Sequence, residues 1–407
     1  MGFDKALALA KDPVAVAKHS FWPLMAYKVE TYKIKEDTTT GILSTHEKSR
    51  GIAYAAHSDS YILSYYCHKL AEIYEKVVES KGIGDAALAF RPLGKSNIDF
   101  AKEAFEEIRR QGNCTAIALD ITKFFDRLDH SLLKRRWKEL IGLSELPKDH
   151  FAVFKVLTKY SKVDRNEVFA ALGISVHNPR NGRRRVCDPS EFRSKVRESN
   201  LIITNNESFG IPQGTAISAL LSNIYMLEFD VAAKAFAKSV GGKYMRYCDD
   251  MLFIVPTSAS ISVKGFAEAE IKSLKLEVNP DKTDTCDFNK VAGTDYLETK
   301  RPLQYLGFLF DGQRILIRSA AFAKFSNRMK RGVNLAKLTM RSRNTDRTSG
   351  GLVERDIYLK KIYSRYSHLG GRNFLRYGYR AAKAMESPAI RRQLRPLWGR
   401  LKHLIES

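Results

Sequence analysis

Three aspartates in two short segments are the side chains of this 407-residue chain best suited to chemistry. The segment ALDITKFFDRLDH (118–130) places Asp120 at the end of a short apolar strand. The segment RYCDDMLFI (246–254) places Asp249 and Asp250 in a tight turn between two apolar strands. Adjacent carboxylates in such surroundings are unfavourable unless a cation lies between them.

The three carboxylates together would form an all-oxygen metal site. Such a site suits Mg²⁺, which keeps part of its water and takes its other ligands from substrate phosphates. Two ions can activate an attacking 3′-hydroxyl and stabilise a leaving pyrophosphate. Each segment alone has a simpler explanation, since an Asp-Asp pair is common in solvated turns and Asp120 could cap a helix.

A third segment, SFGIPQGTAISALLSNIYM (208–226), contains a glycine-rich turn before a helix. Gly210, Pro212 and Gly214 predict a tight turn whose backbone can approach a base pair closely. Gln213 could reach the sugar or base of an incoming nucleotide. An ordinary loop that leads into a helix is the alternative.

The hydrophobic periodicity predicts the elements that position these motifs. We expect a helix over 60–80, a helix capped by Asn97, a strand over 114–119, a helix capped by Ser131, a helix over 215–238, a strand–turn–strand over 244–255, a hairpin over 303–317 that turns at Asp311-Gly312, a helix from Ala320, and a polar break over 341–351. The result is an α+β core followed by a helical, basic tail.

The positive charge is concentrated at the C-terminal end. The chain has 68 Lys and Arg against 45 Asp and Glu, a net charge of +23. Residues 311–407 carry +17 of this, with aromatic residues interleaved among the bases, and the first 310 residues carry +6. Phosphate attraction combined with stacking indicates nucleic-acid binding, with a solvated helical face as the alternative. A second basic cluster lies over 180–197, in a segment that predicts a loop or insertion.

Several protein classes are disfavoured by composition. With 44% hydrophobic residues the chain is too apolar to be disordered. Its five cysteines are scattered and form no CxxC pair, so neither a disulfide framework nor a zinc knuckle is indicated. We see no signal peptide and no apolar run of about 20 residues, so we expect a cytoplasmic protein without a membrane partner.

The three motifs together resemble those of a known enzyme family. Asp120-x-x-x-Phe124-Phe125-Asp126, Ile211-Pro-Gln-Gly214 and Tyr247-Cys-Asp-Asp250 occur in the order typical of reverse transcriptases. The resemblance implies an α+β right-hand polymerase fold. Its parts would be an N-terminal extension with fingers (1–112), a palm (113–300) with inserted fingers and a basic loop around 150–205, a primer-grip hairpin (301–319) and a basic helical thumb (320–407).

The resemblance also implies residue roles. Asp120, Asp249 and Asp250, with the Ile121 carbonyl, would hold two Mg²⁺ ions, for which Mn²⁺ would substitute. The expected nucleotide-binding residues are Arg91 and Lys282 at the triphosphate, Phe125 under the sugar, and Gln213. The expected primer grip is Tyr305, Leu306 and Gly307. The arginines that we expect to contact nucleic acid in the tail are Arg372, Arg376, Arg380, Arg391 and Arg392.

Within reverse transcriptases the chain is similar to the bacterial "unknown group" enzymes, and most to class 2 defence-associated reverse transcriptases. The segments His57-Ser-Asp59 and Lys95–Ala101 carry this likeness. It implies that a structured non-coding RNA is copied from deoxynucleoside triphosphates into cDNA, in defence against phage. Two alternatives stay open: a maturase-like splicing cofactor that binds RNA, and an RNA-synthesising polymerase, which Phe125 disfavours.

Overall fold

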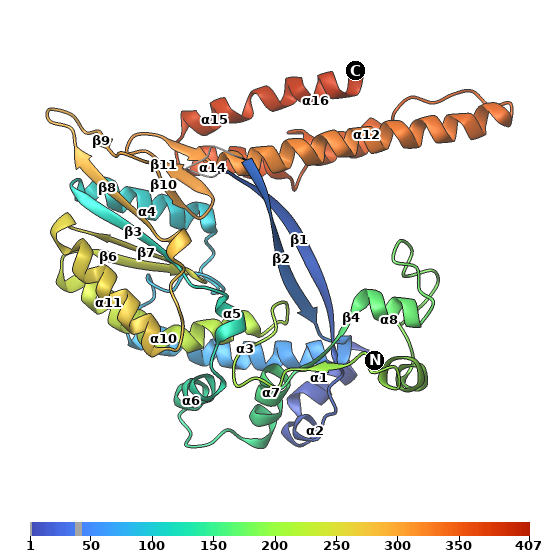
Figure 1. The fold of residues 1–407 in the computed structure, drawn as a ribbon, viewed down its shortest axis with the longest axis horizontal. Helices are drawn as coiled ribbons and strands as arrows, with labels where there is room; N and C mark the ends of the chain where they lie inside the picture. The colour runs from blue at the N-terminus through green and yellow to red at the C-terminus, as the bar shows by residue number, and fades with distance from the viewer. Residues whose placement is uncertain (1, 37–42) are drawn as a thin grey trace. The chain divides into compact units, whose positions relative to one another are not determined.

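The computed structural model describes residues 2–36 and 43–407, which fall into two compact units (Figure 1). Unit 1 comprises Met1–Arg91, Ile121–Ala235 and Gly265–Asn279. Unit 2 comprises Pro92–Asp120, Phe236–Lys264 and Pro280–Ser407. Helices α10 (Ser218–Ser239) and α11 (Ser260–Ser273) have residues in both units.

Unit 2 is built on a five-stranded sheet in the order β6-β7-β3-β8-β9, with every pair antiparallel. Its strands are β3 (Cys114–Asp120), β6 (Lys243–Tyr247), β7 (Asp250–Val255), β8 (Asp284–Lys290) and β9 (Leu297–Glu298). The central strands β3 and β7 are buried almost throughout, as their continuous apolar sequences require. The predicted strand over 114–119 and the strand–turn–strand over 244–255 are confirmed.

Helix α4 (Asn97–Gln111) packs against β3 and β7 with the predicted apolar face. Its cap differs from the prediction, because Ser96 and not Asn97 is the N-cap residue. Ser96 and Asp99 form a capping box, in which the Asp99 carboxylate accepts from the Ser96 backbone N–H at 2.8 Å. Asn97 is thereby free to make a contact described below.

The predicted hairpin over 303–317 is a three-stranded meander. Its strands are β10 (Leu303–Tyr305), β11 (Phe308–Phe310) and β12 (Ile315–Ile317), all antiparallel. The turn at Asp311-Gly312 joins β11 to β12 as expected, and a second turn at Leu306-Gly307 joins β10 to β11. Both residues of the second turn have positive φ, 46° for Leu306 and 92° for Gly307.

The C-terminal segment of unit 2 is helical, as predicted. It comprises α12 (Ser319–Ser349), α13 (Leu359–Tyr366), α14 (Phe374–Ala384), α15 (Pro388–Leu394) and α16 (Pro396–Glu406). The polar break expected over 341–351 is wrong, since α12 continues to Ser349 and ends at Gly350-Gly351. Residues 341–349 are polar but contain no glycine or proline, so nothing in the backbone interrupts the helix.

The segment also has anchors to the meander: the Ser387 hydroxyl donates to the Ile315 carbonyl (2.7 Å), and the Gln393 amide donates to the Ile317 carbonyl (3.0 Å).

Unit 1 contains a four-stranded sheet in the order β2-β1-β4-β5. Strands β1 (Leu24–Glu36) and β2 (Leu43–Tyr54) are antiparallel, β4 (Ser161–Asp164) runs parallel to β1, and β5 (Ile203–Thr204) is antiparallel to β4. The helices of this unit are α1 (Phe3–Lys11), α2 (Pro13–Ala17), α3 (His57–Ser80), α5 (Phe124–Arg127), α6 (His130–Ile141), α7 (Lys148–Thr158), α8 (Arg165–Ala171) and the single turn α9 (Pro189–Glu191).

The predicted helices of this unit are present with small differences. Helix α3 covers the range expected over 60–80 and buries Ile62, Tyr66 and Leu70. Helix α6 is capped by Asp129, whose carboxylate accepts from the Leu132 backbone N–H at 2.9 Å, and not by Ser131. Asp129, two residues earlier, serves the same purpose because its carboxylate also favours the positive end of the helix.

No helix within residues 2–36 and 43–407 is both long and apolar enough to cross a bilayer.

Candidate active site

The three aspartates lie at one edge of the unit 2 sheet. Asp120 ends β3, Asp250 begins β7, and the two residues are directly opposite each other in the antiparallel register. Tyr247 and Asp250 also pair, so Cys248 and Asp249 form a two-residue hairpin turn between β6 and β7. The sequence pattern therefore predicted both the strand end and the turn, and the register brings them together.

The turn is held in an unusual backbone conformation. Cys248 has a φ of 63°, a region that favours glycine. Its side chain is buried, and burial raises the pKa of its thiol. The guanidinium of Arg246, which is fully buried in β6, donates from Nη1 to the Cys248 carbonyl at 2.9 Å. Arg246 thus fixes the turn that presents Asp249.

The carboxylates are electrostatically crowded. The pKa of Asp250 is raised to about 6, first by the loss of solvation among the surrounding protein atoms and then by Asp249 and Asp120. Although the Asp250 residue is open to solvent on one side, the two neighbouring negative charges disfavour its ionisation. Lys282 and Arg318 act in the opposite direction.

A cationic side chain already lies on this cluster. The Lys282 ammonium, from the short turn after Asn279, forms an ion pair with the Asp120 carboxylate. Sequence analysis placed Lys282 at a triphosphate, and this role stays a prediction. Among the residues that the structure describes, no three His, Cys, Asp or Glu side chains already lie in a metal-binding arrangement. The excess of carboxylate at the edge nevertheless has the donor chemistry of a divalent-cation site.

The β10–β11 turn, where we expected the primer grip, is tied to the C-terminal helices. The Asn97 amide donates to the Leu306 carbonyl at 3.0 Å and to the Tyr377 hydroxyl at 2.9 Å. The Arg318 backbone N–H donates to the Gly307 carbonyl at 3.3 Å. Tyr305, the last residue of β10, is buried, and burial raises the pKa of its hydroxyl. Leu306 and Gly307, which form the β10–β11 turn, are partly exposed.

The region that holds these residues has a known counterpart. A family model described as reverse transcriptase (RNA-dependent DNA polymerase) matches residues 60–310, more than half of the chain. The chain belongs to the reverse transcriptase family. It therefore has the right-hand polymerase fold that its motifs implied, with an RNA-dependent DNA polymerase domain that contains Asp120, Asp249 and Asp250. Reverse transcriptase domains use divalent metal ions for nucleotidyl transfer.

Solved structures with some similarity include telomerases. An apo telomerase from Candida tropicalis is 12% identical, with a TM-score of 0.46, over 74% of this chain and 51% of that chain. A telomerase from Candida albicans in complex with a TWJ fragment of telomeric RNA is 13% identical, with a TM-score of 0.39, over 93% of this chain and 64% of that one. The chain thus spans about half to two thirds of their length, and the family assignment rests on residues 60–310 alone. None of the curated proteins matches the chain.

The other predicted nucleotide contacts belong to unit 1. Arg91 is almost fully buried and its guanidinium is bound internally, to the Glu75 carboxylate (2.7 and 2.9 Å) and the carbonyls of Gly84 and Ala87. Phe125 is half-buried, with its ring against that of Phe124. The reverse transcriptase roles of both residues stay predictions, and Arg91 has a structural role in addition.

Gln213 lies in a turn that is locked to β2. Its carbonyl accepts from the Ala53 backbone N–H at 2.7 Å. The next residue, Gly214, has a φ of 111°, and a Cβ there would lie 2.9 Å from the Ala53 carbonyl oxygen, so only glycine fits. The side chain of Gln213 stays partly exposed. Ile121, whose carbonyl was expected to bind metal, is buried and pairs with Val278.

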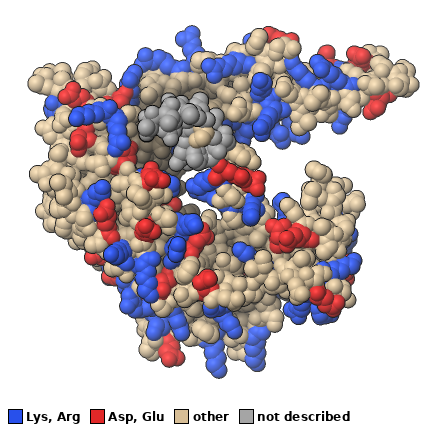
Figure 2. Space-filling view, viewed as in Figure 1, with Lys and Arg blue, Asp and Glu red and all other residues tan. Residues whose placement is uncertain are grey.

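The five arginines predicted to contact nucleic acid are all exposed in unit 2. They lie on or beside the helices α14 and α15, and Arg380 lies over the Tyr377 ring. On the face drawn in Figure 2, Lys and Arg follow the C-terminal helices with few acidic residues among them. Their role in binding stays a prediction.

Sequence analysis did not identify Arg246 or Arg318. Arg246 is a basic residue inside the otherwise apolar strand YMRY, immediately before the aspartate turn. A charge at a strand position that must be buried is the signal that could have found it. Arg318 lies between β12 and α12 and gave no comparable signal.

Arg246 is testable as a positioning residue. Arg246→Met keeps most of the side-chain volume but leaves the buried Cys248 carbonyl without this donor, which costs about 1–3 kcal/mol. We expect kcat for nucleotide addition to fall at least about tenfold, while KM for the nucleotide changes less than about threefold. Steady-state extension kinetics measure the split. Arg246→Lys should restore part of kcat. If both variants lost kcat equally and circular dichroism showed that both were unfolded, the positioning role would be contradicted.

The crowding of carboxylates predicts a pH-dependent stability. The folded-state pKa of Asp250 lies above the ordinary value of 3.8, so its ionisation costs stability as the pH rises from about 4 through about 6. Asp250→Asn cannot ionise and should have a Tm a few degrees higher than the wild type at about pH 7.5 in EDTA. The difference should narrow as the pH falls and close below about pH 4, where the carboxyl is protonated in both the folded and the unfolded states. Thermal melts at both pH values check this, and a pH-independent difference would exclude charge crowding as its cause.

Proposed function

We propose that this protein is an RNA-directed DNA polymerase that copies an RNA template into cDNA from deoxynucleoside triphosphates. The observation that carries the proposal is the direct pairing of Asp120 with Asp250, beside Asp249, within the region that matches the reverse transcriptase family. Paired carboxylates that repel each other have no structural benefit, so their placement favours a role in binding cations.

We further propose Mg²⁺ as the metal, with two ions and Mn²⁺ as a substitute. Asp120, Asp249 and Asp250 would hold the ions, and the Ile121 carbonyl would add an oxygen. Bound there, the metal would activate the primer 3′-hydroxyl and stabilise the departing pyrophosphate. The ion pair of Lys282 with Asp120 supports this, because it shows that the edge attracts a cation.

Lys282 has a second part to play in this proposal. If a metal ion neutralised the charge of Asp120, the attraction that holds the Lys282 ammonium on that carboxylate would be lost. The ammonium is then available for the negative triphosphate of the incoming nucleotide. Phe125 would exclude a 2′-hydroxyl, and the exposed arginines of α14 and α15 would hold the nucleic acid.

The biological setting is proposed from sequence resemblance. The likeness to class 2 defence-associated reverse transcriptases supports a bacterial, cytoplasmic enzyme that copies a structured non-coding RNA during anti-phage defence. The intact aspartates disfavour a splicing cofactor without polymerase activity, and the half-buried Phe125 ring disfavours an RNA-synthesising polymerase. The RNA and DNA that co-purify with the protein can be sequenced to identify the template.

The central test removes two of the carboxylates. Asp249→Ala/Asp250→Ala should abolish incorporation of deoxynucleotides on a primed RNA template, a loss of at least about 10³-fold, because the charge that binds metal is gone. Binding of the RNA, measured by fluorescence anisotropy, should survive. Asp295→Ala, an exposed aspartate of the same unit, is the matched control and should leave extension unchanged. Extension at the wild-type rate by the double variant would refute the assignment.

Lys282 gives a second test, with two readouts of opposite direction. In Lys282→Met, KM for the nucleotide should rise about tenfold, because a charge-assisted contact to the triphosphate is lost. The Mg²⁺ concentration for half-maximal rate should fall, because no ammonium competes for Asp120. Titrations of nucleotide and metal measure both. A higher Mg²⁺ requirement would show that Lys282 supports the metal site and does not compete with it.

A further inference from the structure

Unit 1 contains a large groove that the polymerase site does not use. It lies between helix α7 and the N-terminal segment from α2 to the start of β1, and its volume is about 1180 Å³. Figure 1 shows α2 and α7 in the same part of the fold, and the two helices pack together. The volume exceeds the roughly 300–1,000 Å³ of a small-molecule pocket, which favours a polymeric ligand.

One face of α7 provides the floor of the groove. Lys148, Phe151, Lys155 and, just beyond the helix, Lys159 recur at intervals of three to four residues and therefore share a face. The opposite face carries the apolar residues that join the core, such as Val153 and Phe154. Phe151 is 43% exposed, although a large aromatic ring normally gains by burial.

The groove has a strong excess of positive charge. Lys18 and Arg197 line it together with the three lysines of the α7 face. Within the described part of the chain, Lys18, Lys148, Lys155 and Arg197 have no acidic partner, and Lys159 donates only to the carbonyls of Asn206 and Glu207. The acidic residue of the lining, Asp149, is buried and accepts from the Tyr66 hydroxyl at 2.5 Å.

The N-terminal wall is fixed in place by a buried carboxylate. Asp59, 1% exposed, accepts from the Trp22 backbone N–H at 2.8 Å and lies 2.9 Å from His19 Nε2. His19 and Trp22 both line the groove. The wall is therefore preorganised, which lowers the entropic cost of binding a ligand.

A basic loop adjoins the groove through a shared apolar core. The π-helical turn Phe192–Arg197 ends at the groove, and Phe192 packs edge-to-face on Trp22 with ring centroids 5.0 Å apart. Phe192 and Val196 belong to a cluster with Val163 and Phe169. This apolar cluster anchors the basic segment 180–197, which the sequence predicted to be a loop or insertion.

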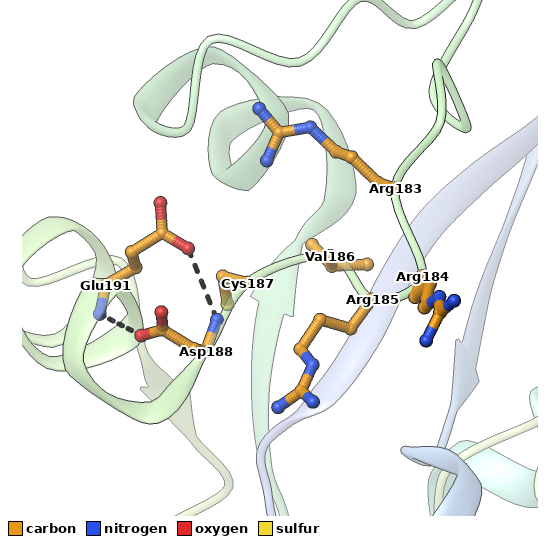
Figure 3. Close-up of a pocket in the computed structure, with 7 residues that line it drawn as sticks. All are labelled: Arg183, Arg184, Arg185, Val186, Cys187, Asp188 and Glu191. Carbon is orange, nitrogen blue, oxygen red and sulfur yellow. Dashed lines mark hydrogen bonds between the residues drawn. The ribbon is translucent and has the colours of Figure 1, made fainter.

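The loop before that turn presents three arginines. Arg183, Arg184 and Arg185 surround a depression of about 490 Å³ and point in different directions (Figure 3). The nearby carboxylates are already engaged, because Asp188 accepts from the Glu191 backbone N–H and Glu191 accepts from that of Asp188. Among the residues that the structure describes, none of the three guanidinium groups forms an ion pair, so they are left for an external anion.

We propose that this groove, defined by α7, residues 13–23 and the basic loop 183–197, binds single-stranded RNA outside the polymerase site. Lysines that alternate with an exposed aromatic ring match the needs of a single strand, whose phosphates are attracted by cations and whose unpaired bases stack. The proposal deepens the proposed function, since it gives the polymerase a second contact with its template RNA.

The test compares two charge reversals of equal size. Lys148→Glu/Lys155→Glu changes the groove, and Lys5→Glu/Lys76→Glu makes the same change of net charge at exposed sites of α1 and α3. The probe is a fluorescein-labelled 20-nucleotide oligouridine, titrated in EDTA without nucleotides, so that catalysis plays no part. We expect the groove variant to bind at least about tenfold more weakly than the control at about 100 mM salt. The slope of log K against log salt concentration should be smaller in magnitude by about 1.4, which corresponds to two lost phosphate contacts.

Phe151→Ala tests the stacking component. Loss of one stacked base should weaken oligouridine binding about fivefold or more without a change in salt slope. Phe3→Ala, at another exposed phenylalanine, is the matched control and should bind as the wild type does. Oligouridine that carries 4-thiouridine should crosslink to residues 148–159 in the wild type.

The outcomes separate this proposal from the proposed function. Groove variants that lose oligouridine binding but extend a saturating, pre-annealed RNA–DNA primer–template support both. Lost binding with no extension even by the wild type supports the groove and refutes the polymerase. Equal binding by groove and control variants, crosslinks elsewhere, or retention by anionic vesicles in place of oligouridine would overturn the groove as an RNA site.

Discussion

The main physical constraint on unit 2 is the electrostatic repulsion between two paired aspartates. Asp120 and Asp250 are opposite each other across the β3–β7 pair, where like charges destabilise a sheet. The strands stay paired because the adjacent pairs, from Leu119 opposite Met251 to Thr115 opposite Val255, are buried almost throughout and continue the ladder. The repulsion is confined to the end of the strands, where solvent and a cation can reach it. A strand end is the place where an apolar sheet can carry such a charge.

Sequence patterns predicted this edge well because both its parts are local. Asp120 follows an apolar run, and Asp249-Asp250 interrupts another, so the strand end and turn could be placed without knowing the partner strand. Features that depend on contacts distant in sequence were not predicted. Arg246 supports the turn from within the sheet, and Asn97 joins the β10–β11 turn to Tyr377, 280 residues away. The cap predicted at Asn97 was wrong because the neighbouring Ser96 can complete a reciprocal pair with Asp99. The continuation of α12 was missed because polar composition was taken as a break.

Two groups of cationic side chains in this protein have different physical roles. Arg91 and Arg246 are buried and committed to carbonyl or carboxylate oxygens of the fold, so their charges are compensated internally. The lysines of α7 and the arginines of α14 and α15 are exposed, so their charges act on solvent and on ligands. The net charges of the two sequence regions, +17 for residues 311–407 and +6 for the first 310 residues, do not reveal which cations are buried and which are exposed. A small net charge of +6 for the first 310 residues is compatible with a strongly basic groove, because most of the acidic residues lie outside the groove.

Lys282 belongs to neither group, because it is exposed and yet ion-paired with a carboxylate of the site. Its side chain is partly exposed, yet it is paired with the Asp120 carboxylate. A lysine ammonium is a point charge on a flexible stem, whereas a buried guanidinium such as that of Arg91 is bound to several oxygens at once. At the proposed metal site, the Lys282 ammonium is the cation that a metal ion would replace on Asp120. Arg246 holds the turn that presents Asp249, and the Lys282 ammonium balances the charge of Asp120.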